Sequence, residues 1–164
     1  MRICFLAADT MLITQELLDE VAAEAAASPR RRKNRNFHRT NEDAAHRLLN
    51  ALEPDSYVMP HRHLDPSKDE TIVAVRGRFG LVLFGEDGAV QTTAVLAADG
   101  KTLGVDIPHG TFHTLVALEP GSVFFEAKAG PYVAMTEAER ANWAPAEGTT
   151  EAKDYLERMR RLFN

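Results

Sequence analysis

The chain has 164 residues, a length typical of one domain and long enough to bury a hydrophobic core without disulfide or metal support. Apolar residues make up 45% and charged residues 26%, which is an ordinary globular composition, and the net charge is −5. This acidity argues against nonspecific nucleic-acid binding, and the sequence has no run of about eighteen apolar residues that could span a membrane.

The N-terminal residues 1–14, MRICFLAADTMLIT, contain a short apolar run that Asp9 interrupts. They have neither the long apolar core nor the small-residue cleavage site of a signal peptide. The single cysteine, Cys4, excludes an internal disulfide, as is usual in the reducing cytoplasm. We therefore expect a cytoplasmic protein without a membrane partner.

Residues 14–27, TQELLDEVAAEAAA, predict a helix, because alanine is abundant and Thr14 is suited to the N-cap position. A second helix is predicted at 42–52, EDAAHRLLNAL, where three leucines form one apolar stripe and Pro54 follows the end. A helical N-terminal arm, residues 1–53, is the resulting expectation.

The two predicted helices flank a basic run at 30–39, RRRKNRNFHR, which holds six of the nineteen basic residues. One interpretation is a solvated loop. The other is a flap that closes over an anionic ligand such as a phosphate or a carboxylate. In the second interpretation Arg35, Asn36 and His38 are candidate substrate-binding residues.

From residue 54 to residue 130 the chain changes to short runs rich in β-branched and aromatic residues, separated by turns that contain Gly, Pro and Asp. This spacing predicts an antiparallel sandwich or barrel and a mainly β fold class. The predicted strands are 56–63, 70–77, 78–85, 89–97, 101–108, 111–118 and 122–129.

The C-terminal part, residues 131–164, is predicted to form a second helical arm. Thr136 and Glu139 have the spacing of a capping box. Residues 150–162 carry an apolar stripe with helical spacing. With no internal repeat or linker in sight, we expect residues 1–164 to form a single domain whose helical arms pack on the barrel or on a partner subunit.

Two histidines, His61 and His63, lie one residue apart in the first predicted strand, so they share a face about 7 Å apart along it. Glu70 opens the next strand, and His113 follows the turn Pro108–Gly110. Each alone is most simply a half-buried or solvated polar residue. Together, three imidazoles and a carboxylate suit a divalent transition metal and leave coordination positions for water or substrate.

These residues resemble the two sequence motifs of the cupin family. PHRH, Glu70 and Gly77 are similar to its first motif, HxH followed by glutamate and glycine, and PHGTFH is similar to its second, PxGxxH. The resemblance implies a cupin barrel, a double-stranded β-helix or jelly roll, with the metal bound by His61, His63, Glu70 and His113.

Three departures from the motifs concern mainly the carboxylate ligand. Six residues separate His63 from Glu70 where the family has three or four, which leaves Asp65 and Asp69 as competing acids. The glycine expected before HxH is missing, and Ala117 stands where the second motif has asparagine. A wider likeness over about residues 14–160, carried by RRRKNRNFH, YVMPHRH, EAKAGPY and NWAPAEG, is to WbuC-type cupin metalloproteins, whose genes lie near surface-polysaccharide genes.

Further candidates follow from strand alternation. Tyr57 shares the inward face with the two histidines, and Arg76 shares the inward face with Glu70. Glu126 and Lys128 share one face of the last strand. That face is either inward, next to the metal, or solvated with Phe125 and Ala127 in the core. Tyr57, Glu126 and Lys128 are therefore candidate acid–base residues, and Arg76 is a candidate substrate-binding residue.

Three functions fit these observations. The first is a metal-dependent enzyme for a small anionic or sugar-type substrate, with isomerase or epimerase chemistry. The second is an Fe(II) dioxygenase. The third is a non-catalytic carbohydrate-binding module that the metal stabilises. The expected cofactor is one divalent ion, Fe, Zn, Ni or Mn, and the expected assembly is a homodimer.

Overall fold

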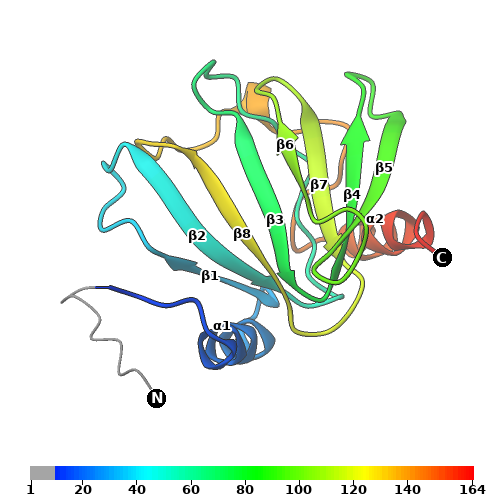
Figure 1. Cartoon of the computed structure of the whole chain (residues 1–164). Coiled ribbons are helices and arrows are strands. Elements are labelled where there is room, and N and C mark those ends of the chain that lie inside the picture. The colour runs from blue at the N-terminus through cyan, green and yellow to red at the C-terminus, as the bar shows by residue number, and fades with distance from the viewer. Residues whose placement is uncertain (1–9) are drawn as a thin grey trace.

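A computed structural model describes residues 10–164 and contains two α-helices, eight β-strands and one 3-10 helix within that range (Figure 1). Residues 1–9, which include Cys4 and the run without signal-peptide features, lie outside the described residues. The elements are α1 (Gln15–Ala27), β1 (Arg32–Asn36), β2 (Ala45–Leu52), β3 (Glu70–Arg76), β4 (Arg78–Phe84), β5 (Val90–Ala97), β6 (Gly104–Ile107), β7 (Phe112–Ala117), β8 (Ser122–Ala129), η1 (Glu137–Glu139) and α2 (Thr150–Arg161).

The strands form two antiparallel sheets that face each other (Figure 1). One sheet has the order β1-β2-β8-β3-β6 and the other the order β5-β4-β7. The space between them is filled by a cluster of buried apolar side chains that includes Phe79, Phe124 and Ile72. Because side chains alternate along a strand, Glu70, Glu126 and Lys128 lie on the same inward face as this core.

Each helix covers the outer face of one sheet. On the five-stranded sheet, Leu18 and Val21 of α1 pack against Leu49 and Val123. On the three-stranded sheet, α2 packs through an apolar stripe against β4 and β7. The stripe residues are Ala152, Tyr155, Leu156 and Met159. The molecule is therefore four layers thick, and only the space between the sheets is open to a site on the strands' inner faces.

Most of the predicted elements are confirmed. The helix at 14–27 begins one residue later, with Thr14 as its N-cap. The capping box of Thr136 and Glu139 is present, and α2 occupies the predicted C-terminal segment. Six of the seven predicted strands match β3 to β8. In the remaining one, residues 56–63, only His61 forms a β-bridge.

The predicted helix at 42–52 is wrong, because Ala45–Leu52 forms β2. This strand pairs with β1 on one side and with β8 on the other. Leu52 faces the core between the sheets, while Leu49 faces α1. Since both faces of β2 are covered, its apolar residues do not alternate with polar ones, and the pattern resembles a helical stripe.

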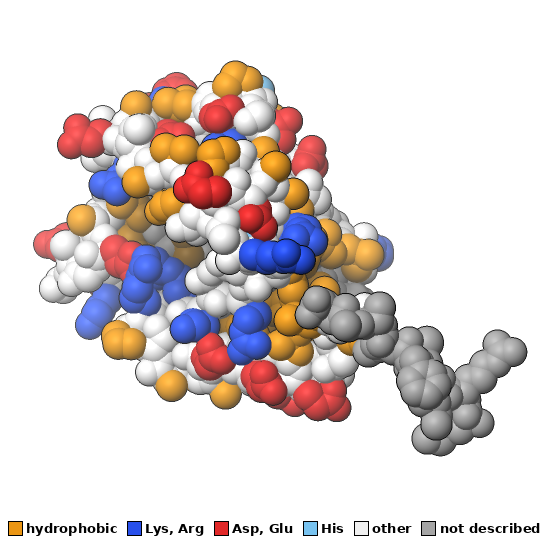
Figure 2. Space-filling model, turned by 90° about the vertical axis from the view of Figure 1, so that its left-hand side faces the viewer, with side chains coloured by type: hydrophobic (Ala, Val, Ile, Leu, Met, Phe, Trp, Pro, Cys, Tyr) orange, Lys and Arg blue, Asp and Glu red, His pale blue; other side chains and the backbone are white. Residues whose placement is uncertain are grey.

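The basic run is also not a loop, because Arg32–Asn36 forms β1 at the edge of the five-stranded sheet. The sheet therefore begins at Arg32 and not near residue 54, so the predicted helical arm 1–53 is wrong beyond α1. Charged side chains on an edge strand hinder pairing with a second chain. On the face seen in Figure 2, basic side chains lie among acidic ones over its lower half.

Glu147 joins the basic run to the segment that precedes α2. Arg30 donates two hydrogen bonds of 2.8 Å to its carboxylate, and Arg32 donates one of 2.9 Å. The hydrogen bonds from Arg30 and then from Arg32 lower the pKa of Glu147 to about 2. A carboxyl whose pKa is lower in the folded state stabilises the fold above its unfolded pKa and loses this contribution as the pH falls.

We expect Glu147→Gln to be less stable than the wild type at neutral pH, and this difference to disappear between about pH 4.5 and pH 2. The side chain is 36% exposed, so the difference should not exceed about 1 kcal/mol. Urea unfolding of both proteins at a series of pH values measures it. A difference that persists unchanged at pH 2 would show that the ion pair contributes nothing to it.

Candidate metal centre

Three separate segments bring the ligand candidates together. The extended residues before β3 carry His61 and His63, Glu70 is the first residue of β3, and His113 is the second residue of β7. The backbones of His61 and His113 exchange two hydrogen bonds, of 3.1 and 2.9 Å. The turn at Gly110 is anchored as well, because its N–H donates to the carbonyl of His63 at 2.6 Å. The two sequence motifs therefore meet at one point of the barrel.

The side chains converge on Glu70. Its Oε2 lies 3.3 Å from His63 Nε2 and 3.3 Å from His113 Nε2. One ligand-type atom each of His61, His63 and Glu70 lies within 4.8 Å of the other two. For metal bonds of about 2.1 Å, two neighbouring ligand atoms are separated by about 3 Å, close to the distances seen here.

The hydrogen bonds of the imidazoles orient their free nitrogens. His61 Nδ1 lies 3.0 Å from the carbonyl of Met59, and His113 Nδ1 lies 2.9 Å from the carbonyl of Thr111. Each Nδ1–H can donate to its carbonyl, and this places the lone pair on Nε2. Outer hydrogen bonds of this kind fix the tautomer of metal-binding histidines.

Two atoms of the cluster are buried without a hydrogen-bond partner: His63 Nε2 and Glu70 Oε2. Leaving such atoms unpaired in a protein interior costs about 1–3 kcal/mol each, so native structures rarely do it without a reason. A divalent cation would satisfy both atoms at once. The donor set of nitrogen and carboxylate oxygen fits a transition metal.

The electrostatics of the cluster favour neutral imidazole and ionised carboxylate. Burial, with a further contribution from His113, lowers the pKa of His61 to about 3. Burial alone would raise the pKa of Glu70, but the close imidazoles of His113 and His63 and the ammonium of Lys128 bring it well below its usual value. Both are the protonation states that metal ligands need.

A charged pair adjoins the cluster on β8. Lys128 Nζ lies 2.6 Å from Glu126 Oε1 and 3.6 Å from Glu70 Oε1. Asn50 on β2 donates to the other Glu126 oxygen at 2.8 Å. Burial and the nearby Glu70 raise the pKa of Glu126 to about 7, and the two carboxylates raise the pKa of Lys128 against the effect of burial. Of the two sequence interpretations, the structure selects the inward one.

A cavity of about 340 Å³ opens from this cluster to solvent. His61, His63 and Lys128 line it, so both ligand-type histidines and the ammonium are accessible to a small molecule. The exposed side chains of Leu64, Tyr132 and Val133 flank it. Lys68 also lines it and donates to the carbonyl of Pro131 at 2.6 Å, which ties the loop before β3 to the loop after β8.

The structure does not bring three of the other candidates to this cavity. The Tyr57 hydroxyl donates to the carbonyl of Pro145 at 2.9 Å, within the core under α2. Arg35 pairs with Glu24 of α1 at 2.7 Å. Arg76 pairs with Asp19 of α1 at 2.8 Å. A register shift between Ala74 and Arg76, typical of a β-bulge, reverses the alternation and places Arg76 on the outer face.

Asn36 and His38 lie beside a second cavity, of about 220 Å³, next to the first. His46, which the predicted helix had placed on the surface, is buried in β2 and stacks on His38 with ring centroids 4.0 Å apart. Sequence reasoning missed His46 and Asn50. Reading 42–52 as a strand with period 2 would have placed both on one face, opposite Lys128 and Phe124.

The remaining acids and histidine near the cluster have other partners. Asp65 accepts hydrogen bonds from the backbone and hydroxyl of Ser67. Asp69 Oδ1 lies 2.8 Å from His109 Nδ1 and accepts from the backbone N–H of His109. Neither acid belongs to the group of potential ligand atoms found among residues 10–164. Glu70 is therefore the acid best placed to complete the site.

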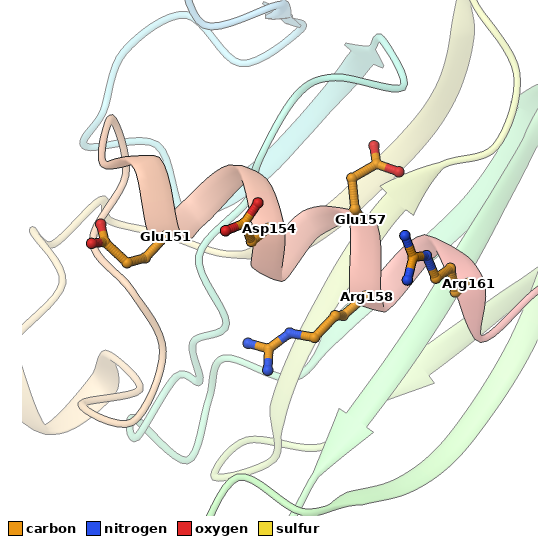
Figure 3. A pocket seen from close by; sticks show the side chains of 5 residues that line it. All are labelled: Glu151, Asp154, Glu157, Arg158 and Arg161. Atoms are coloured by element: carbon orange, nitrogen blue, oxygen red, sulfur yellow. The ribbon is translucent and has the colours of Figure 1, made fainter.

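A cavity of about 510 Å³ along α2 has a different character (Figure 3). Acidic and basic side chains of this one helix line it: Glu151, Asp154, Glu157, Arg158 and Arg161. They project along the solvent side of the helix and do not converge on a common point (Figure 3). This arrangement is typical of a solvated helix face, so we assign no chemistry to it.

The paired antiparallel sheets and the site at the ends of β3 and β7 define a cupin-fold protein with a candidate metal centre. Residues 13–96, just over half of the chain, match a family model described as "Domain of unknown function (DUF6016)", and the chain belongs to this family. Among curated proteins, none matches the sequence.

Solved structures support the fold. KdgF from Halomonas sp. is 22% identical with a TM-score of 0.50, over 65% of this chain and 84% of that one. The capsular polysaccharide assembling protein CapF from Staphylococcus aureus is 18% identical with a TM-score of 0.51, over 65% of this chain and 28% of that one. A cupin-2 domain containing protein from Shewanella frigidimarina is 17% identical with a TM-score of 0.45, over 60% and 80%.

No helix among residues 10–164 is both long and apolar enough to cross a membrane.

Proposed function

We propose that the protein is a divalent-metal-dependent enzyme that moves a proton on a small carbohydrate-type or anionic substrate, as in an isomerisation or epimerisation. One observation carries this proposal. Lys128 lines the same cavity as His61 and His63 and lies 3.6 Å from Glu70. A charged, movable proton carrier thus stands beside a cluster with the donor set of a metal site.

His61, His63, Glu70 and His113 would hold the ion, one of Fe, Zn, Ni or Mn. When bound, such an ion polarises a carbonyl or hydroxyl oxygen of the substrate as a Lewis acid. Lys128 would attract a carboxylate or an enolate-like oxygen and exchange a proton with it. Glu126, held by Asn50 at 2.8 Å, would keep the ammonium in position and receive its proton charge.

The test is deuterium exchange by NMR in heavy water, with metal-loaded protein and a panel of reducing sugars, sugar acids and nucleotide sugars. We expect exchange at a carbon next to a carbonyl in one class of these compounds. Lys128→Met should slow it roughly 10²–10⁴-fold, the usual contribution of acid–base catalysis, while Lys128→Arg should retain the fold. Tyr57→Phe is the control, because its hydroxyl contacts Pro145 and not the cavity.

If no compound of the panel exchanges, the isomerase proposal fails. The same donor set also suits Fe(II) and dioxygen chemistry. Oxygen consumption by the iron-loaded protein with thiols, diketones or catechols would therefore replace proton transfer by a dioxygenase reaction.

A biological setting in surface-polysaccharide synthesis is part of this proposal. It rests on the sequence likeness to WbuC-type cupins. A cytoplasmic location and a homodimer remain proposals on the same footing, and sedimentation equilibrium of the purified protein measures the assembly.

A further inference from the structure

The inner face of the five-stranded sheet remains polar beyond the metal centre. Starting from Glu70 on β3, the inward positions are Lys128 on β8, His46 on β2 and Asn36 on β1. Register places Asn36 opposite Leu48 and Asn34 opposite Asn50, so both asparagines share that face. A strip of polar groups thus runs across four strands from the candidate metal site to the sheet edge.

This strip borders the two cavities. The larger contains the candidate metal ligands, and the smaller is lined by the side chains of Asn34, Asn36, His38 and Asn41. His46, Lys128 and Tyr132 line both cavities, so these two spaces adjoin along a shared wall. A ligand with two rings could occupy both.

The lining of the smaller cavity is rich in hydrogen-bonding groups and nearly free of charge. Asn34 Nδ2 donates to Asn36 Oδ1 at 2.8 Å, and this leaves one carbonyl oxygen and one amide nitrogen of the pair for a ligand. His38 and His46 are 7% and 5% exposed, and each uses one ring nitrogen on a backbone carbonyl, of Arg47 and Asn41 respectively. Acceptors and donors that alternate in this way match the hydroxyl groups of a sugar.

An aromatic side chain completes the lining. Tyr132 is 59% exposed and lines both cavities, so its ring is accessible from the solvent side. The apolar C–H face of a sugar ring packs well on such a ring, which combines an apolar body with a polar tip. A phosphate fits less well, because the nearby Arg35 is committed to Glu24 on α1 and Lys128 to two carboxylates.

We propose that the smaller cavity is a subsite for a neutral sugar ring, so that the substrate is a two-ring saccharide. Its first ring reaches the metal centre and its second ring contacts Asn34, Asn36 and Tyr132. This inference rests on the proposed function for the first ring. The binding of the second ring depends only on the sheet and therefore survives removal of the metal.

The test uses saturation-transfer NMR and calorimetry with maltose, cellobiose, lactose and diacetylchitobiose at millimolar concentration, on metal-loaded and metal-stripped full-length protein. We expect at least one disaccharide to bind both forms. Asn34→Ala/Asn36→Ala should weaken this binding roughly tenfold or more, since two hydrogen bonds to hydroxyls are lost. The variant should keep its metal content, because neither asparagine touches the cluster. Asn142→Ala, an exposed asparagine outside both cavities, is the matched control.

Three results would overturn the subsite. The first is no binding of any disaccharide by the wild type. The second is binding that the double variant leaves unchanged, which would place the sugar in the metal cavity alone. The third is inorganic phosphate that competes with the sugar in an Asn34-dependent way, which would make the cavity an anion site. Loss of metal-dependent turnover with sugar binding intact would instead remove the proposed enzyme activity and leave the subsite.

Discussion

Protein purified without a histidine tag is expected to contain close to one divalent transition metal ion per chain, and His61→Ala to contain almost none. The imidazole of His61 is oriented by Met59 and lies beside Glu70 and His63, so its removal breaks the ligand set. Loss of an outer hydrogen-bond partner alone costs about 10- to 100-fold in affinity, and loss of a ligand should cost more. Elemental analysis with a chelator competition measures both quantities.

His109→Ala is the matched control for this experiment. His109 lies near the cluster in sequence, but it is exposed and pairs with Asp69. It should therefore keep the full metal content. Glu70→Ala should lose metal and Asp69→Ala should not. Equal metal in wild type and His61→Ala would rule out the centre described here, and the histidines would then belong to a polar pocket.

Phe79→Ala is expected to destabilise the fold by about 3–5 kcal/mol, the cost of removing a large aromatic side chain from a packed core. Phe79 is fully buried between the sheets, and its ring meets that of Phe124 edge to face with centroids 5.2 Å apart. Its removal leaves a cavity that the two sheets cannot easily close. Urea unfolding of the metal-stripped proteins gives the change in the free energy of unfolding.

The control for this core substitution is Val90→Ala. Val90 is 42% exposed at the start of β5, so its truncation should cost less than about 1 kcal/mol. At low temperature, folded Phe79→Ala should still bind metal, because the ring belongs to the core cluster and not to the ligand set. A cost below 1 kcal/mol for Phe79→Ala would mean that the sheets are not held together by this core.

The ligand candidates are predictable from sequence because the spacing of short motifs reports local geometry. HxH in an extended segment places two imidazoles on one face, and Pro108 with Gly110 makes the turn that presents His113. The identity of the acid was open among Asp65, Asp69 and Glu70. The structure brings Glu70 into the cluster, since Asp65 and Asp69 have their own hydrogen-bond partners.

By itself, the sequence determined the mainly β fold class, the helices at both ends and the histidines that meet at one point, since each depends on short-range periodicity and turn chemistry. Only the tertiary structure decided that 42–52 is a strand, because its apolar residues face α1 on one side and the core on the other. A bulge after Ala74 turned Arg76 toward Asp19, and acids of α1 paired with Arg35. Contacts between segments far apart in the chain leave no local pattern, so only packing could show which basic residues face a ligand.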